Sequence, residues 1–366
     1  MKNVKLIGFL MLLSSSLMFI QCTSDAEIIG PQGVAGINGT NGIDGTNGTN
    51  GADGVDGTAT CVSCHSENHR TPIENSYLLS SHNNQTIMYD GSTLTDYTNK
   101  SYFYGSCARC HSNEGYIDYI NGEEAATINN PTVITCTTCH EKHSTFDFEN
   151  DGYDYALRNF EPVTLIVDET KTIDFGDTSN TCAQCHQPRT ATPTSIDGKF
   201  TISSSHWGPH HGPQATLIEG IQGANIVGNT AYPTPGSATH RTGSSCVKCH
   251  MGETTDGSDG AHSWVQTLNA CTTCHTSGAP SEVGGLTEDM ETLAILLEAV
   301  TGEDAETGDP IVGIIHDGHP QEGIFTITEA EAAWNYLFIL EDKSGGIHNP
   351  AYAKALIKNS IEALQP

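Results

Sequence analysis

One pentapeptide pattern, Cys-x-x-Cys-His, occurs six times between positions 61 and 275 and uses twelve of the thirteen cysteines. We number the copies motif 1 to motif 6 in chain order. Their cysteines are, motif by motif, Cys61 and Cys64, Cys107 and Cys110, Cys136 and Cys139, Cys182 and Cys185, Cys246 and Cys249, and Cys271 and Cys274. The histidines that close the motifs are His65, His111, His140, His186, His250 and His275. Every fold open to this chain must therefore hold two thiols and one imidazole together six times.

Three common uses of paired cysteines do not account for the histidine. A disulfide framework suits an exported chain, but it gives no reason for a histidine to follow each pair. With 17 histidines in 366 residues, six such coincidences have a chance on the order of 10⁻⁸. A zinc ribbon uses two cysteine pairs per metal and ignores the histidine. A thioredoxin-like site needs one motif in a βαβ context.

The remaining use of Cys-x-x-Cys-His is the covalent attachment of haem c. Each thiol forms a thioether with one haem vinyl group, and the histidine that follows is the proximal ligand of the iron. We therefore expect six covalently attached haem c groups. Six large apolar macrocycles would also explain why only 36% of the residues are apolar and 7% aromatic.

Residues 60–283, which contain all six motifs, resemble the multihaem c-type cytochromes. The resemblance implies that the haems are attached after export and exchange electrons with one another. It also implies a fold class that is mostly α with extensive irregular loops, packed around the haems rather than around aliphatic side chains.

The second axial ligand of each iron decides the function, because an iron with two protein ligands transfers electrons while an iron with one can bind a substrate. Eleven histidines lie outside the motifs, whereas Met88, Met251 and Met290 are the only methionines after the N-terminal segment. We therefore expect two histidines at every iron. The distal candidates are His82, His143, His210, His211, His240, His262 and His348. The alternatives are His69, His206, His316 and His319.

The N-terminus predicts export. Lys2 and Lys5 precede an apolar run over 6–20, and Cys22 follows it directly. This arrangement resembles a bacterial lipoprotein signal peptide over 1–21 with Cys22 as the lipidation site, although Gln21 departs from the small residue usual there. An ordinary secretory peptide and an uncleaved anchor are the alternatives. The acidic residues of "CTSDAE" resemble surface-export signals, so we expect a lipid anchor in the outer membrane and favour its outer face over its periplasmic face.

A glycine recurs at every third position from Gly30 to Gly57, after a short linker over 22–29. This is the collagen period, but Pro31 is the only proline in the tract of 30–59. A trimer built on this collagen-like spacer and a solvated tether are the two interpretations. Both hold the haem region away from the membrane.

The last region, 284–366, has helical spacing and no cysteine. We expect helices that begin at Thr287, at a capping box of Thr328 and Glu331, and at Asn349 followed by Pro350, all packed on the haem core. Residues 334–361 resemble the C-terminal helices of cytochrome c nitrite reductases. In that family the catalytic haem is usually attached through Cys-x-x-Cys-Lys, which this chain lacks.

These features predict an electron-transfer hexahaem cytochrome that passes single electrons to an outer or periplasmic acceptor. Its partners would be redox proteins, including other multihaem cytochromes, and the membrane through the lipid. A net charge of −29 argues against nucleic acid. The alternative is a reductase of a small nitrogen or sulfur oxyanion at one open haem. The chain is thus more consistent with a carrier than with an enzyme, and we assign no catalytic residue. A purely structural, collagen-like adhesin is a third alternative.

Overall fold

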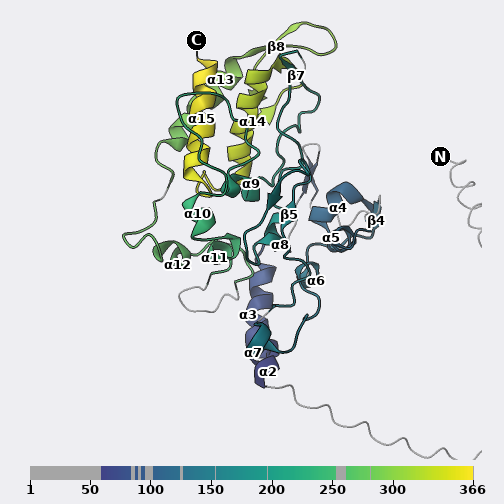
Figure 1. Cartoon of the computed structure of the whole chain (residues 1–366). Helices are drawn as coiled ribbons and strands as arrows, with labels where there is room; N and C mark the ends of the chain where they lie inside the picture. The colour runs from purple at the N-terminus through teal and green to yellow at the C-terminus, as the bar shows by residue number, and fades with distance from the viewer. Residues whose placement is uncertain are drawn as a thin grey trace, which may run out of the picture. The chain divides into compact units, whose positions relative to one another are not determined.

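Fourteen helices and twelve short strands make up the part of the chain described by the computed structural model, which covers residues 59–83, 87–89, 92–94, 102–123, 127–152, 154–195, 197–252, 261–280 and 282–365 (Figure 1). Gly57–Pro366 form one compact unit. The predicted signal peptide, Cys22, the linker and all but the last residue of the glycine tract lie outside the described residues.

The helices fall into two length classes, with the longest at the C-terminal end. Their bounds are α2 (Ala59–His65), α3 (Glu67–Leu78), α4 (Gly105–His111), α5 (Asn113–Ile120), α6 (Cys136–Cys139), α7 (Phe148–Asp151), α8 (Asn180–Ala183), α9 (Gln214–Glu219), α10 (Thr239–Thr242), α11 (Cys246–His250), α12 (Leu268–Thr272), α13 (Leu286–Ala299), α14 (Ile327–Asp342) and α15 (Pro350–Leu364). The described motif cysteines lie on or beside helices of four to seven residues, which are too short to be stable alone.

The strands are β1 (Ile87–Tyr89), β2 (Ser92–Leu94), β3 (Tyr102–Tyr104), β4 (Thr127–Asn129), β5 (Val163–Thr164), β6 (Thr172–Ile173), β7 (Lys199–Ile202), β8 (Thr301–Glu303), β9 (Pro310–Val312), β10 (Ile315–His316), β11 (His319–Pro320) and β12 (Gly323–Thr326). Eight of them form two-stranded antiparallel pairs. The other four form one antiparallel sheet in the order β7-β12-β8-β9, in which Phe325 pairs with Phe200. The expectation of a mostly α chain is corrected here, because the fold mixes helix and sheet. Strands this short give too few alternating positions to be recognised in the sequence.

The larger of two apolar clusters in the described residues lies at the C-terminal end, where α13, α14 and α15 pack side by side (Figure 1). Trp334 and Phe338 of α14 are fully buried, as are Leu293 of α13 and Leu356 of α15. Phe325 of the four-stranded sheet joins the same core. The apolar faces of these helices therefore pack on one another and on the sheet. Residues from the helix ends, such as Asp342 and Pro350, line the cavity described below, and the packing of these helices on a haem core stays a prediction.

Side-chain caps mark where two of the three long C-terminal helices begin. Asn349 caps α15 by accepting a hydrogen bond from the Tyr352 amide at 3.1 Å, with Pro350 at the first helical position, as the sequence predicts. The capping box of α14 is formed by Thr326 and Glu329, two residues before the predicted pair. Helix α13 begins after Gly285, so Thr287 lies inside the helix rather than at its cap.

A buried polar contact ties the loop at 222–226 to the long helices. Asn335 of α14 accepts a hydrogen bond from the Ala224 amide and donates one to the Ala224 carbonyl, each at 2.8 Å. Gly223 lies so close to α15 that an added Cβ would come within 2.6 Å of Leu356. A residue with a Cβ at this position would have to displace the side chains of Leu356 and Tyr352.

Among the helices of the described residues, none combines the length and the apolar character that crossing a membrane requires.

Candidate haem centres

Each motif histidine faces one histidine from elsewhere in the chain, and the six pairs have nearly the same spacing. We number the pairs by their motifs. The distances between ring centroids are 6.1 Å for His65 and His143, 6.0 Å for His111 and His210, 6.3 Å for His140 and His262, 6.2 Å for His186 and His82, 6.3 Å for His250 and His348, and 6.2 Å for His275 and His240. All twelve histidines were singled out in the sequence, six as proximal ligands and six as distal candidates.

This spacing fits one metal ion between the two rings of each pair. A bond between a metal and an imidazole nitrogen is about 2 Å long, so two imidazoles on opposite sides of one ion have their centroids roughly 6 Å apart. If the imidazoles of each pair merely packed against each other, nothing would make the centroid distance the same in all six pairs. The residues present therefore fit an iron with two histidine ligands at each motif.

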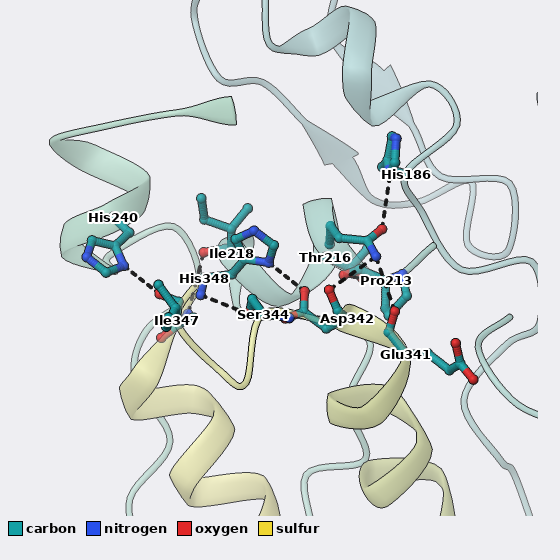
Figure 2. Close-up of polar contacts among 12 residues, drawn as sticks. His186, Pro213, Thr216, Ile218, His240, Glu341, Asp342, Ser344, Ile347 and His348 are labelled. Atoms are coloured by element: carbon teal, nitrogen blue, oxygen red, sulfur yellow. Dashed lines mark hydrogen bonds and ion pairs between the residues drawn. The ribbon is translucent and has the colours of Figure 1, made fainter. Parts of the chain in front are cut away.

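Six of these rings donate a hydrogen bond from Nδ1, which leaves Nε2 to bind a metal. Three rings donate to backbone carbonyls: His140 to that of Tyr155 at 2.8 Å, His240 to that of Ile347 at 2.5 Å and His250 to that of Trp264 at 2.8 Å. Three donate to side-chain oxygens: His143 to Asp154 at 2.6 Å, His186 to Gln214 at 3.1 Å and His348 to Asp342 at 2.6 Å. Figure 2 shows His240 and His348 held in this way by Ile347 and Asp342. Such second hydrogen bonds orient the imidazoles of metal sites and fix their tautomer.

Burial keeps several of these imidazoles neutral, the form that binds a metal. Burial and the nearby His186 lower the pKa of His82 to about 4. Burial, with His211 and Arg189 as neighbours, lowers the pKa of His111 to about 4. Burial followed by Arg189 lowers the pKa of His210 to about 3. At neutral pH these rings are ready to bind metal without losing a proton.

Two of the distal histidines contact a carboxylate. Asp154 accepts from His143, from the Ser144 amide and hydroxyl, and from the Ala156 amide. Burial raises the pKa of Asp154, but these hydrogen bonds outweigh it and hold the pKa well below its usual range. The side chain of Asp342 is fully buried and accepts from His348 and from Ser344. Burial lowers the pKa of His348, and the bond to Asp342 outweighs it and raises that pKa.

A single cavity of about 4010 Å³ connects the six pairs and is lined by residues of every motif. An ordinary ligand pocket measures about 300–1,000 Å³, so this cavity has room for several large groups at once. The twelve described motif cysteines form no disulfide with one another. They thus keep the thiol groups from which haem attachment forms its thioether bonds.

Motif 4 has cysteines of three other motifs as neighbours. Cys185 donates from Sγ to the carbonyl of Arg109 in motif 2 at 3.8 Å, and the neighbouring Cys110 thiol together with burial raises the pKa of Cys185. The Cys246 thiol of motif 5 together with burial raises the pKa of Cys182 in the same way. Both cysteines also lie near Cys139 of motif 3. Motif 4 therefore lies beside motifs 2 and 5 and near motif 3.

Trp264 contacts three of the histidine pairs at once. Its ring meets His82 edge to face at a centroid distance of 4.5 Å and meets His262 at 5.4 Å. Its carbonyl accepts from His250. Its backbone has a φ of 53°, a left-handed conformation that is uncommon for residues other than glycine. Trp264 thus orients ligands of pairs 3, 4 and 5.

The other histidines have different surroundings. His211, a distal candidate in the sequence, does not form one of the six pairs: it donates from Nδ1 to Glu341 at 2.6 Å and lies beside His210 at 4.7 Å. Nε2 of His316 is hydrogen bonded to the Val312 carbonyl at 2.9 Å. His319 pairs with His316 in the two-stranded β10-β11 sheet. His206 is exposed beside Ser205, and His69 is exposed on α3.

Sequence reasoning missed the residues that hold the ligands. Asp154, Gln214, Trp264 and Asp342 have no motif of their own, and the carbonyl of Ile347 carries no sequence signal at all. Asp342 and His348 lie close in sequence, in "EDKSGGIH", where an acidic residue shortly before a candidate ligand is the one hint available.

Comparison with known proteins gives two solved structures and no sequence relative. The outer cell wall cytochrome OcwA aligns over 79% of this chain and 50% of its own, with 18% identity and a TM-score of 0.47. An undecahaem cytochrome from the S-layer of Carboxydothermus ferrireducens aligns over 85% of this chain and 46% of its own, with 18% identity and a TM-score of 0.41. The chain spans about half the length of each. No protein-family model and no curated protein matches it.

Proposed function

We propose that the chain is a hexahaem c-type cytochrome in which two histidines bind every iron, and that it transfers single electrons outside the cytoplasm. One observation carries the proposal: six motif histidines face six other histidines at centroid distances of 6.0–6.3 Å. A haem iron with two imidazole ligands supplies one-electron exchange between its ferric and ferrous states.

The residues of the chain would attach the haems and hold the axial ligands in place. The motif cysteines would hold each haem, and the six pairs named above would close both faces of each iron. The Nδ1 hydrogen bonds would keep the rings in place when the charge of the iron changes, so that little rearrangement accompanies each transfer. Motif 4, which lies beside motifs 2 and 5 and near motif 3, would join these sites into one network.

The position in the cell follows from the N-terminal sequence. We infer that the chain is exported, that Cys22 carries the lipid and that the glycine tract of 30–59 separates the haem region from the outer membrane, with the outer surface favoured. The electron donor and acceptor would be redox proteins, including other multihaem cytochromes. Whether the glycine tract forms a trimer can be read from the mass of the native protein in detergent.

The competing function is a nitrite-reductase-like enzyme acting on a small nitrogen or sulfur oxyanion, which needs one iron with an open face. The two functions separate in one assay: the absorption spectrum of the dithionite-reduced protein before and after carbon monoxide, with the haem content measured in parallel as the pyridine haemochrome. We expect six haems per chain and no spectral change. A shift in about one sixth of the intensity would favour the reductase, and fewer than six haems would contradict the assignment of the motifs.

A further inference from the structure

Tyr116 of α5 carries a buried hydroxyl group beside the cavity that connects the histidine pairs. The residue is only 2% exposed, and it is part of the cavity wall. Among the described residues, its Oη has no hydrogen-bond partner. Buried polar groups of native proteins are nearly always paired, because an unpaired group has lost its water without gaining another partner. The Tyr116 hydroxyl therefore indicates a partner within the cavity.

Contacts on two sides of α5 fix the position of this tyrosine. Gly115 packs so closely on α4 of motif 2 that an added Cβ would lie 2.5 Å from Ala108. Asn113, in the first turn of α5, accepts a hydrogen bond at 2.8 Å from the hydroxyl of Thr138, which lies between the two cysteines of motif 3. Helix α5 therefore joins motif 2 to motif 3 and holds Tyr116 in the cavity wall.

The surroundings of the hydroxyl keep it protonated. Burial raises the pKa of Tyr116 well above its usual range, and the nearby thiols of Cys185, Cys139 and Cys182 add to this effect. These cysteines belong to motifs 4 and 3, so the tyrosine lies where the two motifs meet. A phenol that keeps its proton has one hydrogen-bond donor to offer. Tyr116 is therefore a fixed donor at the junction of motifs 3 and 4.

Haem c would offer one good acceptor to such a donor. Its macrocycle is apolar and its nitrogens bind the iron, so its remaining polar atoms are the oxygens of its carboxylate side chains. A thioether sulfur is only a weak acceptor. A hydroxyl that donates to an ionised carboxylate forms a short hydrogen bond, roughly twice as strong as one between neutral groups. A haem carboxylate is therefore the partner that fits Tyr116.

We propose that Tyr116 binds haem directly, by donating a hydrogen bond from its hydroxyl to a haem carboxylate at the junction of motifs 3 and 4. The proposal rests on the haem sites proposed above. The hydrogen bond draws off part of the negative charge of the carboxylate, a charge that favours the ferric state of the iron. Tyr116 thus raises the reduction potential of the haem that it binds.

The test compares the exported holoprotein with Tyr116→Phe, which keeps the ring and removes the hydroxyl. In the resonance Raman spectrum, the carboxylate bending band of one haem should shift. Spectroelectrochemical titration at roughly pH 9, well above the usual pKa of a carboxyl group, should show a lower potential for one haem. We expect the ferric-to-ferrous ratio of that haem at a fixed potential to rise about threefold, which corresponds to about 28 mV for one electron.

A matched control lies on the same helix. Tyr119→Phe removes the same atom from α5 at a position outside the cavity wall, and it should leave the Raman bands and the potentials unchanged. Thermal unfolding adds a readout whose sign is informative. Removing a buried hydroxyl that has no acceptor should keep or raise the melting temperature, whereas removing one that is bound to a carboxylate should lower it. We expect Tyr116→Phe to lower it.

The outcomes are distinguishable from a failure of the proposed function. If the wild-type protein and Tyr116→Phe both hold six haems and share the same Raman bands and potentials, the inference is wrong while the haem assignment stands. A lower melting temperature without these changes would mean that Tyr116 donates to a water molecule, and it overturns the inference as well. So does a higher potential in Tyr116→Phe. A wild-type haem content below six contradicts the proposed function itself.

Discussion

The region of the long C-terminal helices and the region of the six motifs are built on different principles. Around α13, α14 and α15, large apolar side chains such as Trp334 and Phe338 fill a core of the ordinary kind. Around the motifs, helices of four to seven residues surround a cavity of about 4010 Å³. The first region can be held by burial of its own side chains. The second needs a large apolar group to fill it, and covalent haem would provide one.

The largest effect should come from the central motif. In a variant with Cys182→Ala and Cys185→Ala, one haem is lost, and its neighbours at motifs 2, 3 and 5 lose a packing surface. We expect little folded holoprotein, measured as haem content by intact mass and as thermal unfolding by circular dichroism.

The matched variant is Cys271→Ala with Cys274→Ala at motif 6. We expect it to lose one haem while the other five remain. Equal yields and equal stabilities for the two double variants would contradict the central position of motif 4.

The next effect concerns the apolar core. Trp334→Ala removes a fully buried ring and the hydrogen bond from its Nε1 to the Gln222 carbonyl, so it should lower the free energy of unfolding by about 3–5 kcal/mol. Chemical unfolding followed by far-ultraviolet circular dichroism measures the change. Ile295→Ala, on an exposed position of α13, should stay within about 0.5 kcal/mol of the wild type. A small effect of Trp334→Ala would mean that the haems stabilise this region as well.

A smaller and more local effect is expected at Trp264. Trp264→Ala removes the ring beside His82 and His262 but leaves the carbonyl that holds His250. The ligand signals of pairs 3 and 4 in electron paramagnetic resonance should therefore broaden or shift, and those of pair 5 should not. Trp264→Phe keeps an aromatic ring and should restore most of the wild-type spectrum. A change in all six signals, or in none, would show that Trp264 does not orient these ligands.

The smallest expected effect is a difference in the electron paramagnetic resonance signals of the pairs, caused by the angle between their imidazole planes. The rings of pairs 1, 2, 4 and 6 are inclined by 66–80°, whereas those of pair 3 are inclined by 34°. Ferric haems with crossed imidazoles and those with nearly parallel imidazoles give different low-spin resonance signals. We expect both classes in the oxidised protein, with the crossed class more abundant. A single class would contradict the ring geometry of pair 3.

Much of the candidate site could be read from the sequence, because haem attachment requires a contiguous motif. The distal histidines carry no such motif. Surplus histidines could be named, but which ring faces which depends on tertiary packing: His82 faces His186 of motif 4, although motif 2 is the next motif after it in the sequence. His211 could not be separated from His210 by sequence, because they are adjacent and only the fold turns one toward Glu341.

The parts of the fold that short sequence patterns determine, such as the start of a helix, could be predicted. The parts that tertiary packing determines could not. Asn349 and Pro350 mark the start of α15 unambiguously. The stretch "TITEAE" contains two overlapping capping patterns, from Thr326 to Glu329 and from Thr328 to Glu331, and only packing selects the first. The four-stranded sheet joins β7 to strands far along the chain, and such pairings leave no local signal.

Near-infrared magnetic circular dichroism of the fully oxidised protein, with the haem content determined on the same sample, examines the ligand pairs without disturbing them. If the six pairs bind iron, the whole intensity should fall in the charge-transfer band of low-spin haem with two histidine ligands, in an amount equal to six haems per chain. The contrary result is a high-spin band, or the band of a haem with histidine and methionine ligands, with the intensity of one or more haems. It would show that at least one of the six histidine pairs does not supply both axial ligands of its iron.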